Sequence, residues 1–345
     1  MASTRLKLHS QSFKTINSSS QSSPHETLIL HLPFSESFSH NSRLQISSVP
    51  SNLHRKPTTR FLPLCFSVPS VSSPPTSKEE AILQARTCLT SCLLKSINNP
   101  KLASAKLKKL KQPRFRVEIP LVDEDSPSSL SKLASSIFDD LPISRKGSKS
   151  KIIILWPDSS FAEAAAGEFR SYSIQNTGID SVLDTGKNRP ALNSADVAVF
   201  MAPEISKIEE VETVAEVFYP KPVLMMNPRW VFDEEKTLGE EFSRFVGSFE
   251  VIYAFTGLEV RGVLSKRRGV IFKFVRDGVL SGERWSVLVE EEEKDKALKL
   301  VSSFKARPSM EEVETVLYNL MAMNSPITKS ARFLRDLVSN ITGKK

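Results

Sequence analysis

The sequence has few of the residues that most often carry catalysis. It is 345 residues long but holds five histidines, and none of them lies beyond His54. If the first segment of the chain is removed, the mature protein has no imidazole. That excludes a Ser-His-Asp triad, a Cys-His pair, an HExxH zinc motif and any metal site built on two or three histidines.

Cysteine is equally scarce. The three cysteines, Cys65, Cys88 and Cys92, are too few for a structural zinc site or a disulfide framework. Cys88 and Cys92 lie four residues apart on one expected helix, so they share a face, with Cβ atoms too far apart for a relaxed disulfide. We interpret both as small buried apolar residues. A redox switch is the alternative.

Glycine-rich phosphate motifs are missing too. No GxGxxG occurs, and the nearest approach to a phosphate loop runs from Gly178 to Gly186-Lys187, with seven intervening residues in place of four. Asn188 stands where that loop needs Ser or Thr. We interpret this segment as an ordinary turn. The sequence therefore predicts no catalytic set, no cofactor and no metal site.

Long apolar runs are absent as well. The longest stretches are 152–156 and 195–202, and the second contains Asp196. A membrane span needs about 20 apolar residues. The sequence therefore predicts no transmembrane segment.

The first part of the chain has the composition of an organelle transit peptide. Residues 1–77 hold twenty serines and six threonines, with seven Lys/Arg against two acids. Such a Ser-rich, basic and acid-poor segment favours a plastid over a mitochondrial address. We expect a disordered plastid transit peptide over 1–70, cleaved near 60–70. A disordered tail with no targeting role is the alternative.

The remainder alternates helical and strand patterns, which predicts one α/β domain over 78–325. Strands rich in β-branched residues, covered on both faces, favour a Rossmann-like doubly wound, mostly parallel sheet with flanking helices. The expected helices are 78–97, 128–141, 161–172, 204–217, 290–304 and 310–324. The expected strands of this part are 114–119, 151–156, 179–183, 196–201 and 222–226.

After Phe249 the pattern changes to strands joined by short turns. The strands expected there are 251–256, 259–264, 269–275 and 284–289. They predict C-terminal antiparallel hairpins that extend one edge of the sheet. We expect a short basic helix within 326–345 to close the chain.

Polar residues follow two of the expected strands of the sheet, those over 151–156 and 222–226. Asp158, Asn227 and Arg229 come just after strands, each beside a proline. Ligands of open α/β sheets bind beyond the carboxyl ends of the strands, so these three side chains are candidates to line a crevice for an anionic group. The alternative is structural: proline suits a strand end and a first helical turn, and Asp158 can cap the next helix.

A Lys-rich stretch at about 99–112 separates the first expected helix from the first strand. It offers contact with anionic lipid or phosphate, and the alternative is a solvated loop. Aromatic residues for base stacking are lacking apart from Phe115, so we expect no specific nucleic acid. The lysines concerned are Lys101, Lys106, Lys108, Lys109 and Lys111.

Several short motifs along the chain carry a resemblance through their order. They are Glu79-Glu80-Ala81 with Gln84-Ala85, Arg116-Val117-Glu118-Ile119-Pro120, Ile152–Trp156 with Pro157-Asp158, Asp196-Val197-Ala198-Val199 with Pro203, Met226-Asn227-Pro228, Tyr253 before a hairpin with Gly262, and Arg307-Pro308-Ser309. In this order they resemble an uncharacterised domain family of plants and cyanobacteria, which includes the Low PSII Accumulation factors of chloroplasts and the extra domain of a chloroplast adenylate kinase. The similarity covers about 78–324, and the Lys-rich stretch looks like an insertion.

The resemblance implies a stromal or thylakoid-associated protein. Some relatives assist photosystem II assembly by binding other proteins, and no catalytic residue set belongs to the family. We therefore expect a non-enzymatic chloroplast protein whose partners are photosynthetic complex subunits or assembly factors. The alternative is a small-molecule or nucleotide/phosphate-binding protein or enzyme of the stroma, using the crevice at the strand ends.

Overall fold

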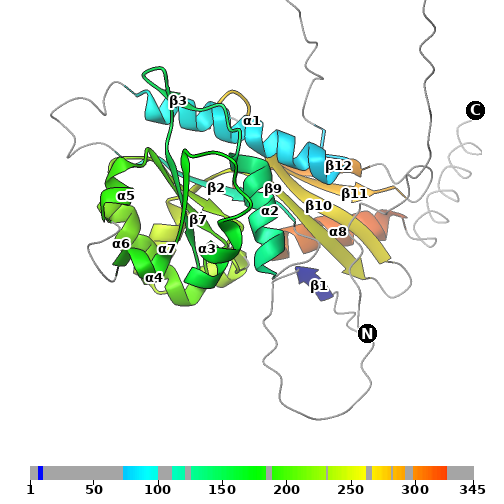
Figure 1. Ribbon diagram of the computed structural model, residues 1–345. Helices are drawn as coiled ribbons and strands as arrows, with labels where there is room; N and C mark the ends of the chain where they lie inside the picture. Colours follow the sequence, from blue (N-terminus) through cyan, green and yellow to red (C-terminus); the bar gives the residue numbers. More distant parts are fainter. Residues whose placement is uncertain are drawn as a thin grey trace, which may run out of the picture.

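The computed structural model describes residues 7–10, 73–99, 111–120, 126–183, 189–230, 232–261, 266–280, 283–291 and 298–324. Helices alternate with strands in the first part of the chain, and strands dominate the last part (Figure 1). The strands are β1 (Lys7–Ser10), β2 (Arg114–Glu118), β3 (Ser144–Arg145), β4 (Ser148–Lys149), β5 (Ile152–Trp156), β6 (Ile174–Gly178), β7 (Val197–Met201), β8 (Val223–Met226), β9 (Glu250–Arg261), β10 (Lys266–Phe274), β11 (Trp285–Glu290) and β12 (Leu298–Phe304).

The helices pack on both faces of the sheet. They are α1 (Lys78–Ile97), α2 (Pro127–Phe138), α3 (Ser159–Ala165), α4 (Ile179–Leu183), α5 (Arg189–Ser194), η3 (Ile205–Lys207), α6 (Ile208–Phe218), η4 (Phe232–Lys236), α7 (Glu240–Gly247) and α8 (Met310–Asn324). None of the helices in the described part of the chain is long and apolar enough to cross a bilayer.

The strands form one mixed sheet. Their order is β12-β11-β10-β9-β2-β8-β7-β5-β6, with β1 paired to β9 beside this path. The pairs β2–β8, β8–β7, β7–β5 and β5–β6 are parallel, and β9 joins β2 in parallel as well. From β9 to β12 the pairing is antiparallel. This confirms the predicted α/β class and the C-terminal strands that extend one edge.

The central strands are buried on both faces. All five residues of β5 are buried, as are those of β7 and β8. Alternate side chains serve opposite layers: Ile152 and Ile154 pack in one apolar cluster with residues of α1 and α2, whereas Ile153 and Leu155 pack in another with residues of α6 and α7. A strand with a helix layer on each face has no polar side, which explains its continuous apolar sequence.

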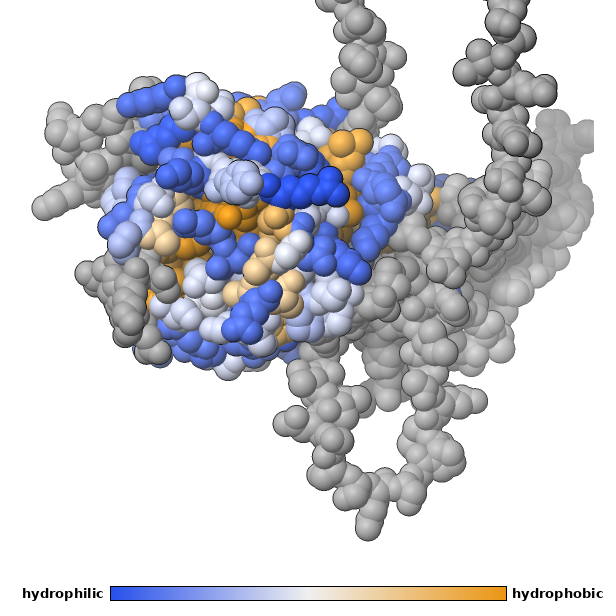
Figure 2. Space-filling view, viewed as in Figure 1, coloured by the Kyte–Doolittle hydropathy of each residue, from blue (hydrophilic) through white to orange (hydrophobic). Residues whose placement is uncertain are grey.

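Helix α1 spans both halves of the sheet. Ser77 caps its first turn by accepting a hydrogen bond from the N–H of Glu80. Its buried face contacts α2, β9 and β10 (Figure 1). Cys88 and Cys92 lie on this face, free and buried, among leucines. On this side of the molecule the surface is mainly hydrophilic, with smaller apolar patches (Figure 2).

One expected strand was placed five residues too late. Residues 179–183 form helix α4, and the strand is β6, whose Gly178 pairs with Trp156 of β5. The sequence of β6 is mostly polar because it is an edge strand. Ile179 and Val182 are three residues apart and share a helical face that packs in the cluster with α6. Apolar content alone therefore indicated the wrong segment.

The expected helix over 290–304 is also wrong. Residues 298–304 form β12, which pairs antiparallel with β11. Apolar residues at Leu298, Val301 and Phe304 fit a helical step as well as an edge strand, and pairing with β11 decides between them. Likewise, 251–256 and 259–264 are not two strands. Residues 250–261 form the single long β9, because β10 pairs with it from Tyr253 to Arg261.

Other boundaries moved by smaller amounts. Helix α3 ends at Ala165, earlier than the expected 161–172, and the expected helix over 204–217 divides into η3 and α6. The sequence patterns gave no sign of α5, η4 or α7. The structure describes only β1 from the expected transit peptide. The expected C-terminal helix and nearly all of the Lys-rich stretch lie outside the described residues.

Candidate functional site

The carboxyl ends of the parallel strands bring Asp158 and Arg229 near each other. Asp158 follows β5 and caps α3, where its Oδ1 accepts hydrogen bonds from the N–H of Ser160 (2.8 Å) and the N–H of Phe161 (3.2 Å). Burial acts to raise the pKa of Asp158. Its hydrogen bonds to Ser160 and Phe161, and the charge of Arg229, outweigh this and hold the pKa below its ordinary value.

Arg229 is bound to its own chain on several sides. Its N–H donates to the carbonyl of Pro203 (2.9 Å), and its Nη1 lies 2.8 Å from Oε1 of Glu204. The guanidinium also stacks over the ring of Phe161, 5.2 Å from the centroid. The structure therefore joins Asp158 and Arg229 with Glu204 and Phe161, two residues that the sequence patterns did not single out for this site.

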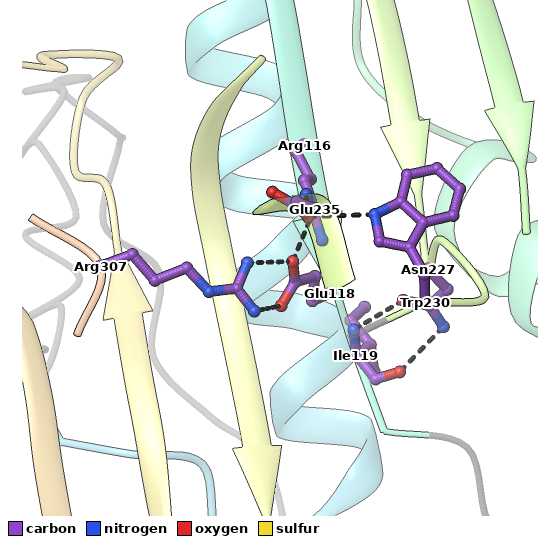
Figure 3. A network of polar contacts seen from close by, with 7 residues as sticks. All are labelled: Arg116, Glu118, Ile119, Asn227, Trp230, Glu235 and Arg307. Atoms are coloured by element: carbon purple, nitrogen blue, oxygen red, sulfur yellow. Dashed lines mark hydrogen bonds and ion pairs between the residues drawn. The ribbon is translucent and has the colours of Figure 1, made fainter. Parts of the chain in front are cut away.

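Asn227 has a different role from these two. Its Oδ1 accepts a hydrogen bond from the N–H of Ile119 and its Nδ2 donates to the carbonyl of Ile119, both at 2.8 Å (Figure 3). Its own N–H donates to the carbonyl of Val117 at 2.9 Å. The buried amide thus completes the pairing of β8 with β2 at the point where both strands end.

Two backbone positions at this edge have unusual conformations. Ala202 follows β7 with φ +46° and Asn227 follows β8 with φ +47°, and each precedes a proline. Asparagine tolerates this left-handed region, but an alanine there costs roughly 1–2 kcal/mol. The N–H of Ala202 donates to the carbonyl of Met226 at 2.8 Å, which helps to hold the strained residue. Such strain often marks a functional edge.

A network of buried charges lies beside this edge, on β2. Arg116 and Glu118 project from the same face of that central strand, and Glu235 of η4 and Arg307 meet them there (Figure 3). Only 3% of the Arg116 side chain is exposed, and 13% of Glu118. Two cations and two anions therefore lie together in a site that is almost closed to water, and the net charge of the four side chains is zero.

The distances in this network are short. Arg307 holds Glu118 by a bidentate pair, with Nη1–Oε1 at 2.7 Å and Nη2–Oε2 at 3.0 Å. The Nε of Arg116 lies 2.6 Å from Oε1 of Glu118, and Arg116 also pairs with Glu235. Trp230 donates from Nε1 to Oε1 of Glu235 at 3.0 Å. Bidentate, charge-assisted contacts of this kind fix side chains strongly.

Aromatic rings enclose the cations. The guanidinium of Arg307 lies over Phe232 (4.5 Å to the centroid) and Trp285 (5.2 Å), and that of Arg116 lies over Trp230 (5.9 Å). These contacts add cation–π attraction and keep water from the ion pairs. The network therefore ties together β2, η4, β11 and the segment that leads into α8.

The network also sets protonation states. Burial acts to raise the pKa of Glu118, but the guanidiniums of Arg307 and Arg116 outweigh it and hold the pKa below its ordinary value. Burial acts in the opposite sense on the pKa of Arg116, and Glu118 and Glu235 raise it above the usual range. Both groups stay charged at neutral pH, so neither is poised as a general acid or base.

The sequence carries a signal for this network in the pattern of β2. The run Arg114–Glu118 alternates charged and apolar residues, which is typical of a strand with one solvated face. In the structure Glu235 of η4, Trp230 and Arg307 lie over this face of β2, so its charged side chains are covered. Charges at alternate positions of a central strand need partners, and here the partners come from η4 and from Arg307.

The remaining reactive groups offer little chemistry. Burial raises the pKa of the Cys88 thiol far above its ordinary value and that of Cys92 to about 11. Among the residues that the structure describes, no group of three His, Cys, Asp or Glu side chains is placed to hold a metal ion.

The comparisons with known proteins agree with this extent of the fold. The model of a family described as a domain of unknown function, DUF1995, matches residues 75–315, well over half of the chain. The chain belongs to the DUF1995 family. The DUF1995 match runs from just before α1 into α8, so it contains the strand-end residues and the whole buried network.

Other comparisons add little. A search of the curated proteins finds no match. Among solved structures, the flagellar accessory protein FlaH from Methanocaldococcus jannaschii matches with 9% sequence identity and a TM-score of 0.25, over 55% of this chain and 90% of that one. A TM-score this low carries no argument about the fold or function of the DUF1995 domain.

Proposed function

We propose that this protein is a non-enzymatic chloroplast protein that assists the assembly or accumulation of a photosynthetic complex of the photosystem II type, acting through protein–protein contacts. One observation carries the proposal. At the sheet edge where an open α/β fold binds its ligand, the polar side chains bond to one another or to the chain's own backbone.

Each candidate ligand group has such an internal partner. Both polar atoms of the Asn227 amide bond to Ile119, and Asp158 is occupied by the first turn of α3. Glu118 is shared by two guanidiniums. A binding pocket needs a few convergent polar groups directed at the ligand, whereas Asn227 and Glu118 are directed into the protein and Asp158 caps a helix. The edge serves as a rigid structural joint, which suits a protein that presents surfaces to partners.

The cellular location rests on the sequence. The Ser-rich, acid-poor first segment supports import into a plastid, and the resemblance to the Low PSII Accumulation factors supports a role in the stroma or at the thylakoid surface. Membership of DUF1995 supports the same resemblance without naming a partner.

Affinity purification of the tagged protein from isolated chloroplasts tests this proposal. Stroma and thylakoids are separated first, and the proteins that accompany the tag are identified by mass spectrometry. We expect photosystem subunits or assembly factors, co-migrating with the protein on native gels. The matched control carries the tag on a chain lacking residues 1–70, which should fail to enter the plastid. A purely monomeric stromal pool would contradict the proposal.

A second candidate is a small-molecule or nucleotide/phosphate-binding role at the same edge. The strained Ala202 and the perturbed pKa of Asp158, which the charge of Arg229 helps to lower, favour it, because backbone strain and shifted pKa values gather at ligand sites. A thermal-shift screen with nucleotides and sugar phosphates tests it, since a ligand that binds the folded state raises Tm. Arg229→Met should abolish any shift, whereas Arg244→Met on the exposed face of α7 should not. If no compound raises Tm, this candidate fails.

A further inference from the structure

Strand β9 is longer than its parallel neighbour β2. The last paired residues of the two strands are Glu118 of β2 and Ala254 of β9. Pro120 comes two residues after Glu118 and has no N–H to donate to a neighbouring strand. On its other side, β9 stays paired with β10 as far as Arg261 opposite Lys266. The part of β9 over 255–261 therefore projects past β2 with one of its edges left uncovered by that strand.

Strand β1 lies on this projecting edge. It pairs antiparallel with β9, with Lys7 opposite Arg261, Leu8 opposite Val260 and Ser10 opposite Leu258. It lies in line with β2 on the same side of β9 and also contacts α8 (Figure 1). The occupant thus comes from the segment that we expect to be cleaved from the mature protein.

The edge has an apolar support. Leu258 is only 4% exposed and packs in a cluster with Trp285 and Val287 of β11 and with Val313 and Leu317 of α8. Helix α8 therefore covers the face of the sheet beside this edge. An added strand gains backbone hydrogen bonds along β9 and a neighbouring apolar layer, the two features that strand-addition sites use.

The charges at this edge do not suit β1. In the register of the sheet, Arg261 is opposite a lysine on each neighbouring strand, Lys266 on β10 and Lys7 on β1. Like charges directly opposite each other destabilise a pair of strands, and opposite charges stabilise it. Arg267 and Arg268 follow Lys266 on β10, and Glu259 of β9 has Arg268 opposite it in register, whereas Arg261 has no acidic residue opposite it on either strand. A strand with an acidic residue opposite Arg261 fits better than β1 does.

We propose that the edge of β9 over 255–261 is a strand-addition site for an extended, acidic segment of a partner protein. In the full-length chain β1 fills it, and removal of the leader opens it. This inference rests on the proposed function for the removal of the leader and for the existence of a partner. A row of unpaired N–H and C=O groups is a template for an added strand.

Hydrogen exchange on the full-length chain tests whether β1 covers the edge. Successive residues of a strand direct their N–H groups to opposite edges, so one of Leu8 and His9 directs its N–H toward β9. Proline has no N–H, and the double variant Leu8→Pro/His9→Pro therefore removes a hydrogen bond to β9 whichever of the two residues donates it. We expect peptides that cover 255–261 to exchange faster in this variant. The matched control, Ser18→Pro/Ser19→Pro, lies outside β1 and should exchange as the parent does. Equal exchange in the parent and in the β1 variant overturns the proposal.

Peptides added in trans test the preference of the site. The probes are labelled peptides of residues 5–12 with the native sequence, with Lys7→Glu, and in scrambled order, each added to the Leu8→Pro/His9→Pro chain. We expect the Lys7→Glu peptide to restore slow exchange over 255–261 and to bind about fivefold more tightly than the native peptide, given the cross-strand charge pair. If it fails to restore slow exchange, or binds no better than the scrambled peptide, the proposal is wrong.

These outcomes are independent of the chloroplast experiment. If the acidic peptide binds but no photosynthetic subunit accompanies the protein in plastids, the assembly role fails and the strand-addition site stands. If subunits accompany the protein but the peptides do not bind, the partner uses another surface and the strand-addition site is rejected.

Discussion

The amide of Asn227 gives the sharpest test of how the strand ends are held. Asn227→Ala removes two hydrogen bonds of 2.8 Å and leaves the N–H and C=O of Ile119 buried without those partners. It also places alanine at φ +47°. No other residue of this joint is changed, so the loss in the free energy of unfolding reports on this side chain alone.

The size of the effect follows from its parts. Each buried backbone group left unsatisfied costs about 1–3 kcal/mol, so the two groups of Ile119 together cost about 2–6 kcal/mol. The left-handed backbone adds about 1 kcal/mol for alanine but not for glycine. A domain of this kind is stable by only about 5–15 kcal/mol. Asn227→Ala therefore removes a large part of the stability of the fold.

Urea unfolding of the parent and two variants measures these parts separately. Asn227→Gly lacks the hydrogen bonds but accepts the positive φ, so we expect it to lose the larger share. Asn227→Ala should lose about 1 kcal/mol more than the glycine variant. Far-UV circular dichroism and tryptophan fluorescence are followed together, because coincident transitions show two-state unfolding.

The reasoning would be refuted by a loss below about 1 kcal/mol in both variants, because that is less than one unsatisfied buried group costs. An alanine variant as stable as the glycine variant would show that the left-handed conformation is not kept at this position. A chain that no longer folds would agree with the upper end of the range. Asn227→Asp, which retains the oxygen that accepts from Ile119, should then recover part of the stability.

Three further predictions concern the charge network and the long hairpin. Arg307→Met leaves Glu118 paired with Arg116 alone and should lower the free energy of unfolding by about 3–5 kcal/mol. As a control, Arg244→Met breaks an exposed ion pair on α7 and should lower it by less than about 1 kcal/mol. Equal losses for the two variants in urea unfolding would contradict the argument that burial makes the Arg307 pair important. The pKa of Glu118 is lowered in the folded protein, so the ionised carboxylate stabilises the fold. This contribution to the free energy of unfolding is complete above pH 4.5, the ordinary pKa, and is lost as the pH falls through the lowered pKa. The stability gap between the parent and Glu118→Gln should therefore narrow on acidification, and a gap that widens would reverse the sign of the shift. Gly269→Ala places a Cβ 2.4 Å from the carbonyl oxygen of Leu288 and should lower Tm. The control Gly257→Ala places a Cβ with nothing within 4 Å and should leave Tm unchanged. Similar Tm values for the two variants would show that the Gly269 position is not as crowded as the structure has it.

Local pattern predicted the parts of the fold that depend on local chemistry. The runs at β5, β7 and β8 are apolar without a break, and only a strand covered on both faces accommodates such a run. The spacing in α1 likewise predicted the bounds that the structure has, Lys78–Ile97. The change to turn-rich strands after Phe249 predicted the antiparallel extension of the sheet.

The predictions that failed did so where local chemistry allows two answers. The apolar residues of 179–183 and 298–304 fit a short helix and a short strand equally well. Packing with α6 selects the helix for the first segment, and pairing with β11 selects the strand for the second. Neither contact can be inferred from the spacing of apolar residues within the segment itself.

For the candidate site, the sequence predicted only its place, at the ends of the parallel strands. Because the carboxyl ends of parallel strands meet at one edge, the sequence predicts that Asp158, Asn227 and Arg229 lie there. The structure directs the Asn227 amide to the backbone of Ile119, just past β2, and brings Asp158 near Arg229. The buried network joins residues 119 positions apart, Arg116 and Glu235, and 189 apart, Glu118 and Arg307. The sequence by itself determined which residues carry charge and which segments avoid water. Only the tertiary structure decided which charges meet, because burying an ion requires an opposite charge brought in from a distant part of the chain.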